Sequence, residues 1–518
     1  MGKTAFHNEK RSTHLSRRRF LGGGAVALAG VGLTRRLGFA SAESTEQDTG
    51  SKITGSHPDV LIKNGFIATM DERRTVHRRG SLYIKDGRIV EIGPRIDAPS
   101  DPGIVIDARN KVILPGFVNT HAHLQQYFRG TYELIGNFYQ VNLPLEGYRS
   151  PEDMDTMGSA SCAEFLYGGC TTALVIYTYP DGFARAAAKA GNRCVLAADI
   201  EEIDLNRLKQ GEYVYLPKKG EAAFARAKAL YETWHGKAEG LITTCLCPKA
   251  PDLVRPETYR RIKTFAREHG LRITTHLAQT WREMEQVKKL YGKTSVRHLM
   301  DIGLLDDVLT GVHCDYITSR DLQLILDAGM GILHCRSVEN PLLQWIDLGI
   351  PVGLGTDDYH HDMLPLLRQN LTGQRMRARS VGGFEGRQSG NRMSRRPTYY
   401  DLLELATRKG AETIGMGKQI GSLEKGKRAD IITFDMNNPY LTPTKDPLTS
   451  IVLYGSSRDI DNVFVDGRRL KADGRMTTID MPKALEEARE KSEEIIAGFF
   501  REHPSQKTNW ERMAPYMK

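Results

Sequence analysis

Apolar and polar positions follow a repeating pattern along most of the chain. Short runs that are apolar throughout are typical of strands buried on both faces. Several are separated by stretches in which apolar residues recur every three to four positions, as in 221–234, 256–269 and 280–290, which predicts amphipathic helices. Alternating strands and helices indicate an α/β fold with parallel strands, and eight of them are the number in a TIM-type (β/α)8 barrel. The predicted strands are 112–118, 171–178, 194–200, 241–247, 271–277, 309–314, 330–335 and 351–357.

The two flanks of this repeat have a different pattern. Residues 59–107 form short alternating runs, and Asp86-Gly87 between two of them is a hairpin signal. A similar pattern returns at 429–436, 451–455 and 462–474, so we expect both ends of the chain to build one small β domain. The predicted division is a signal segment at 1–42, a linker at 43–57, the β domain at 58–115 and 420–479, a barrel at 116–419 and a C-terminal helical extension at 480–518.

Residues 1–42 are interpreted as a targeting segment rather than as part of the fold. The sequence SRRRFL from Ser16 to Leu21 resembles a twin-arginine export signal. The apolar run 21–33 is too short for a bilayer, which needs about 20 residues. Ala40-Ser41-Ala42 is typical of a cleavage site. We expect the twin-arginine machinery to export the folded protein to the periplasm or the exterior; a retained N-terminal anchor is the alternative.

Charge and cysteine content narrow the choice of partners. The chain has 72 basic and 63 acidic residues, a net charge of +9, but residues 1–42 hold eight of the basic and one of the acidic residues. The mature part therefore has 64 basic against 62 acidic residues, which argues against a nucleic-acid partner. No segment after residue 42 is apolar for long enough to span a membrane. The seven cysteines, an odd number, suggest no disulfide framework.

Five polar residues each stand just past a short apolar run that is typical of a buried strand. They are His121, His123, His276, His313 and Asp357. In a parallel α/β barrel the C-terminal ends of the strands converge on one mouth, so residues far apart in sequence meet there. Imidazole nitrogens and a carboxylate oxygen suit Zn²⁺ or Fe²⁺ and leave a coordination position for water. The sequence therefore predicts a metal site and, as the leading hypothesis, a hydrolase.

The chain resembles the amidohydrolase superfamily, in the branch of cytosine-deaminase-like and triazine chlorohydrolase-like enzymes. The matching stretches extend from about Val60 to Ile479 and include VILPGFVNTHAHLQQYFRG, ITTHLAQTWREM, GVHC, LGTDD and LLELATRKGAETIGMGKQIGSLEKGKRADIITFDM. The resemblance implies a (β/α)8 TIM-type barrel with a small β-sandwich built from both ends of the chain. These motifs are specific for the superfamily and say little about the substrate.

The resemblance also implies roles for individual residues. It assigns His121, His123, His276 and Asp357 as metal ligands, and it gives His313 the task of orienting the water and polarising the substrate. Asp357 is placed both as ligand and as acceptor of the proton that a metal-activated water releases. Substrate contacts are predicted from His313 and from three more residues, which are Gln126, Arg129 and Asn340. The alternative for Gln126 and Arg129 is a solvated loop, and the alternative for Asn340 is to hold a loop. His334 matches a family position, although a structural role fits it equally well.

Gln279 departs from the family pattern. The branch usually has glutamate three residues after the third histidine ligand, and that carboxylate passes a proton to a ring nitrogen of the substrate. An amide forms hydrogen bonds but relays no proton. We place Gln279 among the catalytic residues and expect Asp357 to act alone, or another acid such as Glu201 or Glu202 to substitute. A solvated loop is the alternative for these two glutamates.

Further departures concern Lys249 and the segment 339–349. The branch more often shows histidine near Lys249, and other amidohydrolases carboxylate a lysine at this strand to bridge two metal ions; a loop lysine or a contact with a substrate carboxylate is the alternative. Segment 339–349 is shorter than the usual loop, and Arg336 stands where proline is common. Both changes are expected to reshape the rim of the pocket.

Three functional hypotheses remain open. The first is a hydrolase with one Zn²⁺ or Fe²⁺ that breaks a non-peptide C–N bond, or a C–Cl or C–S bond, in a small nitrogen-containing and heterocyclic molecule. The second is a binuclear amidohydrolase of amide, lactone or dipeptide-like substrates, with a carboxylated Lys249. The third is a non-catalytic metal-binding relative. A homo-oligomer is expected in each case.

Overall fold

A computed structural model describes residues 57–517 except 100, 125–127, 132–144, 146, 209, 359 and 382–396. The predicted signal segment 1–42 and nearly all of the predicted linker 43–57 lie outside the described residues, and the predicted domain bounds remain predictions. The described residues form an α/β fold with two parallel sheets and one mixed sheet. None of the described helices combines the length and apolarity that a membrane crossing requires.

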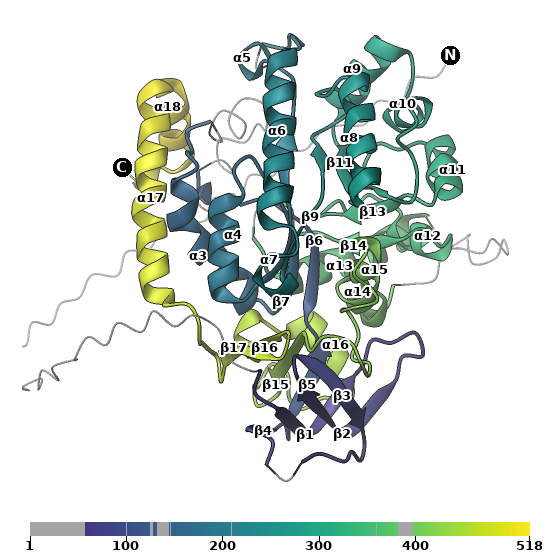
Figure 1. Cartoon of the computed structure of the whole chain (residues 1–518), viewed down its shortest axis with the longest axis vertical. Helices are drawn as coiled ribbons and strands as arrows, with labels where there is room; N and C mark the ends of the chain where they lie inside the picture. The colour runs from purple at the N-terminus through teal and green to yellow at the C-terminus, as the bar shows by residue number, and fades with distance from the viewer. Residues whose placement is uncertain are drawn as a thin grey trace, which may run out of the picture. The chain divides into compact units, whose positions relative to one another are not determined.

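The mixed sheet brings both ends of the described chain together. Its strand order is β18-β17-β16-β15-β5-β1-β2-β3, and β4 pairs with β1. Figure 1 shows the early and late strands side by side below the helices. The junction is the antiparallel pairing of β5 with β15, in which Ile113 lies opposite Thr433. The strands are β1 (Val60–Ala68), β2 (Val76–Lys85), β3 (Arg88–Gly93), β4 (Ile104–Asp107), β5 (Lys111–Pro115), β15 (Ile431–Asp435), β16 (Ile460–Val465), β17 (Arg468–Ala472) and β18 (Arg475–Met476).

The predicted hairpin in this sheet is confirmed. Asp86 and Gly87 join β2 to β3, and both have positive φ, 48° and 72°, as a two-residue turn matched to the twist of the strands requires. One apolar cluster, with Ile62, Ile113 and Phe464 among its members, unites early and late strands. The strands form one hydrogen-bonded sheet, so its division into the two layers of a sandwich remains a prediction.

The two parallel sheets come from the middle of the chain. One has the order β10-β8-β7-β6 with β9 beside β8, and the other has the order β11-β12-β13-β14. Isolated parallel bridges link Leu246 to Ile273 and Ala122 to Asp357, so each sheet touches the other at both edges, which is consistent with a TIM-type barrel. The strands are β6 (Phe117–Ala122), β7 (Cys170–Tyr177), β8 (Arg193–Ile200), β9 (Ile242–Thr244), β10 (Cys247–Pro248), β11 (Ile273–Leu277), β12 (Leu309–His313), β13 (Gly331–His334) and β14 (Val352–Leu354).

Two of the eight predicted strands are divided in the structure. The prediction of one strand at 112–118 is wrong, because β5 ends at Pro115 in the mixed sheet and β6 begins at Phe117 in a parallel sheet. Gly116 lies between them, where a side-chain carbon would overlap the side chain of Thr171. Segment 241–247 likewise contains β9 and the first residue of β10. Both stretches are almost continuously apolar, so hydrophobicity alone does not mark the break.

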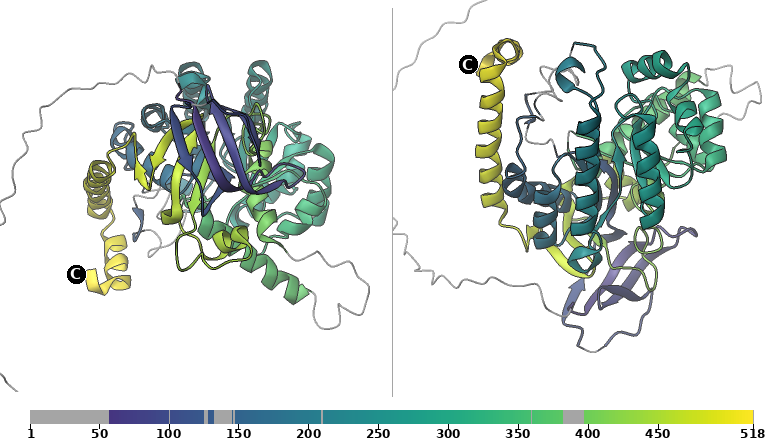
Figure 2. Two further views of the ribbon diagram at one scale, coloured as in Figure 1. Left: turned by 90° about the horizontal axis from the view of Figure 1, so that it is seen from below. Right: turned by 45° about the horizontal axis from the view of Figure 1, so that its top comes forward.

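Helices follow the parallel strands, and the three predicted amphipathic stretches are confirmed within α6, α8 and α9. Figure 2 shows the helices around the strands from two further directions. The helices are α3 (Asp153–Tyr167), α4 (Asp181–Ala190), α5 (Leu205–Leu208), α6 (Pro217–Trp234), α7 (Lys237–Gly240), α8 (Pro256–His269), α9 (Trp281–Tyr291), α10 (Ser295–Asp301), α11 (Ser319–Ala328), α12 (Leu342–Asp347), α13 (Met363–Val381), α14 (Tyr399–Leu405), α15 (Arg408–Thr413), α16 (Pro447–Tyr454), α17 (Met481–Glu502) and α18 (Pro504–Met513), with short 3-10 turns η3 (Ser457–Asp459) and η4 (Pro515–Met517).

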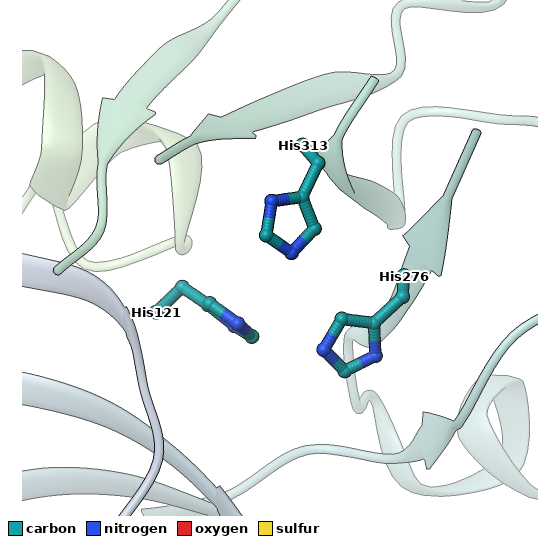
Figure 3. A group of neighbouring side chains, drawn as sticks. All are labelled: His121, His276 and His313. Atoms are coloured by element: carbon teal, nitrogen blue, oxygen red, sulfur yellow. The ribbon is translucent and has the colours of Figure 1, made fainter. Parts of the chain in front are cut away.

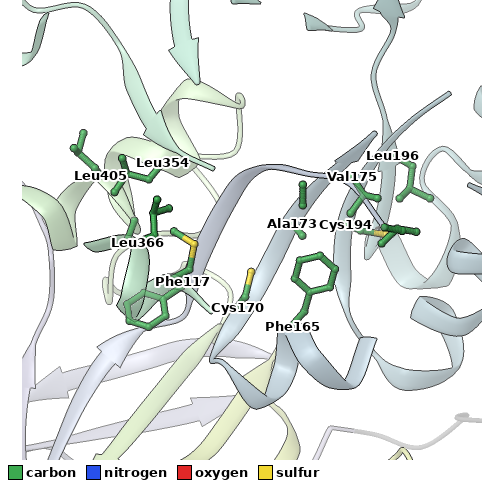
Figure 4. Packing of buried hydrophobic residues seen from close by; sticks show 14 of the residues in the cluster. Phe117, Phe165, Cys170, Ala173, Val175, Cys194, Leu196, Leu354, Leu366 and Leu405 are labelled. Carbon is green, nitrogen blue, oxygen red and sulfur yellow. The ribbon is translucent and has the colours of Figure 1, made fainter. Parts of the chain in front are cut away.

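The core fixes these layers against one another. Figure 4 shows part of its largest apolar cluster, with Phe117, Phe165 and Cys170 packed together between β6, α3 and β7. All seven cysteines are buried free thiols. At the base of β8, Arg193 donates two hydrogen bonds of 2.9 Å to the carboxylate of Asp430, and both side chains are almost fully buried. This ion pair joins a parallel strand to the start of β15.

Candidate metal centre

The first pair of candidate ligands lies at the end of β6. His121 is fully buried on the strand and His123 follows two residues later, with ring centroids 4.7 Å apart. Nδ1 of His123 lies 3.0 Å from the backbone oxygen of Ile176. A carbonyl oxygen can only accept, so Nδ1 of His123 carries the proton and its Nε2 presents a lone pair.

The third candidate, His276, faces the first pair from β11. Its Nδ1 lies 2.8 Å from the backbone oxygen of Lys249, which fixes the same tautomer as in His123. The two Nε2 atoms of His123 and His276 are 3.3 Å apart. Two imidazole lone pairs at this distance repel each other unless a cation lies against both. The two facing lone pairs therefore fit a bound metal ion.

Asp357 reaches the same place from the end of β14. It exchanges backbone hydrogen bonds of 3.0 Å with both neighbours on the opposite segment, donating to His121 and accepting from His123. Its Oδ1 lies 3.5 Å from Nε2 of His121 and 3.7 Å from Nε2 of His123. Burial acts to raise the pKa of Asp357, but the approach of His121 and the neighbouring imidazoles hold it well below 3.8. The carboxylate of Asp357 is therefore ionised at neutral pH.

His313 completes the group from the end of β12, where it pairs with Leu277 of β11. Figure 3 shows the rings of His121, His276 and His313 turned toward a common space. One ligand atom from each of these three residues can be chosen so that all lie within 4.8 Å of one another, and the same holds for His121, His123 and Asp357. The structure thus brings together all five residues that the sequence singled out, while their roles remain predictions.

Protonation of His121, His276 and His313 does not compete with a metal at neutral pH. Burial lowers the pKa of His121 to about 3, and it lowers the pKa of His276 well below 6.5. Burial also lowers the pKa of His313. Among the described residues, neither ring nitrogen of His121 has a hydrogen-bond partner, nor does Nε2 of His313. A neutral imidazole with one unpartnered ring nitrogen is the form in which histidine binds Zn²⁺ or Fe²⁺.

Sequence reasoning missed the backbone strain at these strand ends. Ala278, His313, Cys314 and Asp357 have φ of 50°, 69°, 57° and 63°, in the left-handed region that non-glycine residues seldom adopt. Such residues cluster where a site dictates side-chain direction. Since the strain depends on the fold around each residue, no local sequence signal marks it.

Lys249 lies in a buried charge cluster beside the centre. Its Nζ is 3.1 Å from Oε2 of Glu201 and 3.5 Å from Oδ2 of Asp199, and Lys219 contacts the other oxygen of Glu201 at 2.8 Å. Two carboxylates favour the charged ammonium, whereas carboxylation by CO₂ requires the neutral amine. Glu202, the other candidate substitute acid, accepts hydrogen bonds from Arg255 and Thr258 instead.

The predicted substrate-binding residues that the structure describes differ in their contacts. Arg129 is paired with Glu164, and Gln126 lies outside the described residues. Asn340 is buried and donates to the backbone oxygen of His313 at 3.2 Å and to Asp315 at 2.7 Å, so it supports the loop that carries His313. His334 is also buried, with its Nε2 2.8 Å from the amide oxygen of Asn370.

Two further residues contact the ligand-bearing loops. Arg336 lies 2.7 Å from a carboxylate oxygen of Asp358 and 3.5 Å from Oδ2 of Asp357, so the position that usually holds proline brings a positive charge beside Asp357. Glu283 accepts a hydrogen bond of 2.8 Å from the backbone N–H of Gln279. Sequence reasoning identified Arg336 only as a change at the rim, and it missed Glu283.

Comparisons with known proteins agree with this geometry. Residues 112–470 match the model named "Amidohydrolase family". The 5'-deoxyadenosine deaminase of Methanosarcina acetivorans is 30% identical, and the alignment covers 85% of this chain and 99% of the relative. The 5-methylthioadenosine/S-adenosylhomocysteine deaminase of Symbiobacterium thermophilum is also 30% identical, with 84% and 99% covered.

Solved structures show the same fold. A zinc-bound adenosine deaminase from Xanthomonas campestris has a TM-score of 0.73 at 22% identity, covering 85% of this chain and 99% of its own. The atrazine chlorohydrolase of Arthrobacter aurescens, complexed with zinc, has a TM-score of 0.72 at 22% identity, covering 84% and 100%.

Proposed function

The chain belongs to the amidohydrolase family, and we propose that it hydrolyses the bond between a heterocyclic ring carbon and an exocyclic amino group, with one bound Zn²⁺. Adenine nucleosides that lack or replace the 5'-hydroxyl are the first substrate class to test, because two relatives at 30% identity are deaminases of such molecules. The observation that carries the proposal is the pair of Nε2 lone pairs of His123 and His276, 3.3 Å apart beside Asp357.

The donor set supports a single ion. His121, His123, His276 and Asp357 would hold it, and zinc in two structures of the same fold favours Zn²⁺ over Fe²⁺, which the same donors suit. A second ion bridged by Lys249 is disfavoured because the two carboxylates around its Nζ stabilise the ammonium. When bound, the ion lowers the pKa of a water molecule toward about 7.

Three side chains transfer the proton, bind the substrate and hold the binding residue in place. Asp357, ionised at neutral pH, accepts the proton from the attacking water and returns it to the leaving group. His313, neutral and with Nε2 unpartnered within the described chain, directs a hydrogen bond toward the reacting carbon's substituent. Asn340 holds His313 in place through its backbone oxygen.

Gln279 favours a second candidate reaction at the same site. An amide donates a hydrogen bond to a ring nitrogen but cannot give it a proton. Displacement of chloride or an alkylthio group from an electron-poor ring depends less on that proton than release of ammonia does. Hydrolysis of C–Cl or C–S bonds in triazine-like rings is therefore the alternative.

Metal analysis and a product screen test both candidates. The mature protein should contain about one Zn²⁺ per chain, and it should release ammonia from 5'-deoxyadenosine or 5-methylthioadenosine, or chloride from a chlorotriazine. Gln279→Glu should raise ammonia release and leave chloride release unchanged or lower. A metal content below one tenth of an ion per chain, or no product from any of these rings, contradicts the proposal.

Closure of the two parallel sheets into one barrel is also a proposal. The bridges Leu246–Ile273 and Ala122–Asp357 support one closed (β/α)8 barrel made of both parallel sheets, with β9 and β10 as its fourth strand. Crystallography of the zinc-loaded protein tests this closure. The homo-oligomer remains a prediction that the sedimentation of the same sample checks.

Export by the twin-arginine route is also proposed. The sequence SRRRFL at 16–21 and the Ala40-Ser41-Ala42 site support it, and seven buried free thiols suit a protein that folds in a reducing compartment before export. Replacing Arg17 and Arg18 with lysine should retain the chain in the cytoplasm when cell fractions are compared. Unchanged distribution between fractions contradicts this proposal.

A further inference from the structure

Glu283 is a buried carboxylate that no step of the proposed reaction uses. It is the third residue of α9 and is 2% exposed. Oε1 accepts a hydrogen bond from the backbone N–H of Ala278 and Oε2 accepts one from the backbone N–H of Gln279, both at 2.8 Å. The capping hydroxyl of Thr280 accepts from the N–H of Glu283 at 3.1 Å. One carboxylate thus fixes two successive peptide groups just after β11.

This contact differs from the usual cap of a helix. At α11 and α14 the third residue, Asp321 or Asp401, accepts from the N–H of the capping threonine itself. Glu283 instead reaches past the cap to the two preceding residues. The start of α9 is thereby attached to the segment that leaves the strand of His276.

The same segment is held from its other side. Ala278, with φ of 50°, accepts a hydrogen bond of 2.9 Å from the N–H of Tyr316, and Leu277 accepts one of 3.0 Å from Cys314. Burial and the nearby charge of Asp252 act to raise the pKa of Glu283, but both of its oxygens face backbone N–H donors at 2.8 Å, and only the ionised carboxylate accepts from both. Glu283 and the loop after β12 thus hold segment 277–279 through hydrogen bonds from two sides.

We propose that Glu283 is a positioning residue that fixes the backbone of Gln279 and so aims its amide at the ring nitrogen of the substrate. This inference rests on the proposed function. A carboxylate offers two acceptors, whereas the amide of glutamine offers one acceptor and places an N–H₂ donor against a backbone N–H. Glu283→Gln therefore keeps the size of the side chain and breaks one of the two bonds.

Kinetics of Glu283→Gln test the proposal, with Asp401→Asn as the matched control. Asp401 is the same kind of helix-capping acid, 3% exposed, at the start of α14. Glu283→Gln should lower kcat/KM by about tenfold to a hundredfold, as expected for a misplaced group, with metal content unchanged. Asp401→Asn should lower the urea midpoint and leave kcat/KM within about twofold of the wild type. Equal kcat/KM values for the two variants overturn the proposal.

A double-mutant cycle separates positioning from a general structural effect. If Glu283 acts through Gln279, Glu283→Gln should change kcat/KM by less than about threefold once Gln279 is already alanine. The same loss in both backgrounds overturns the proposal. Should Glu283→Gln fail to fold, Glu283→Asp, which is too short to bind both N–H groups, takes its place in the cycle.

Failure of the proposed function is recognised separately. If the wild type releases no product from any ring tested, the reaction is wrong, and the attachment is measured by amide hydrogen exchange of a peptide covering residues 277–280. Exchange there should be faster in Glu283→Gln than in the wild type and unchanged in Asp401→Asn. Unchanged exchange in Glu283→Gln overturns the placement of Gln279 as well.

Discussion

His334 is a buried neutral imidazole whose replacement should alter the response of the protein to acid. The side chain is 0% exposed, and its Nε2 lies 2.8 Å from the amide oxygen of Asn370. Its Nδ1 faces the amide nitrogen of Asn340 at 3.4 Å. Protonation of Nδ1 would place its N–H against the N–H₂ donor of Asn340, which disfavours the charged ring. His334→Gln removes the titrating group and keeps a nitrogen donor for Asn370.

The magnitude follows from the pKa. Burial lowers the pKa of His334 from 6.5 to about 4, so the unfolded chain binds a proton below pH 6.5 that the folded chain refuses until about pH 4. Because the unfolded state binds more protons, stability falls as pH drops through this window. Between pH 7 and pH 4.5 this one group should lower the free energy of unfolding by about 2 kcal/mol. His334→Gln should lose about 2 kcal/mol less over the same interval.

Urea unfolding of the metal-free protein at pH 7 and pH 4.5 measures this difference. The variant is expected to be less stable than the wild type at pH 7, because it loses ring contacts, and the gap should narrow or reverse at pH 4.5. Metal-free samples are used because metal binding to the candidate ligand histidines also depends on pH. An equal loss of stability in both proteins refutes the structural role of a neutral His334.

The structure predicts the outcome of three further substitutions. Lys249→Met should leave metal content unchanged and lower the free energy of unfolding by about 3 kcal/mol, since Glu201 loses a buried partner; elemental analysis that shows half the metal lost would support a bridging lysine instead. Asp357→Asn should lower kcat by about 10²–10⁴ in the product-release assay, because an amide accepts no proton, and more than a tenth of the activity remaining speaks against this role. Arg193→Leu should destabilise the fold by about 3–5 kcal/mol in urea melts, and adding Asp430→Leu should recover much of that loss; no recovery would place the effect elsewhere.

The candidate site was predictable because its residues occupy positions that topology repeats. His121, His276 and Asp357 each follow an apolar run, and parallel strands bring such ends to one place. The helical stretches were also predictable from their apolar period, since 256–269 coincides with α8 and 280–290 differs from α9 by one residue at each end. In both cases the information is local, and the fold applies the same rule to every unit.

Contacts that depend on tertiary geometry were not predictable. The attachment of Glu283 to the N–H of Gln279 skips the expected capping partner, and the contact of Arg336 with Asp357 joins two strand ends. The division at Gly116 was hidden because apolar residues continue through it while the strands on either side join different sheets. The hydrophobic pattern indicates which residues are buried, but it does not indicate which strand or helix covers them.

The pairing of β5 with β15 has a consequence for biosynthesis. The two strands are separated by roughly 300 residues, so at 5–20 residues per second the ribosome needs about 15–60 s to deliver the second after the first has emerged. During that interval β5 exposes an unpaired backbone edge, which other nascent chains can adopt as a partner. Yield of soluble protein should therefore depend on how fast and how densely the message is translated, and any chain that stops before Ile431 leaves that edge permanently open.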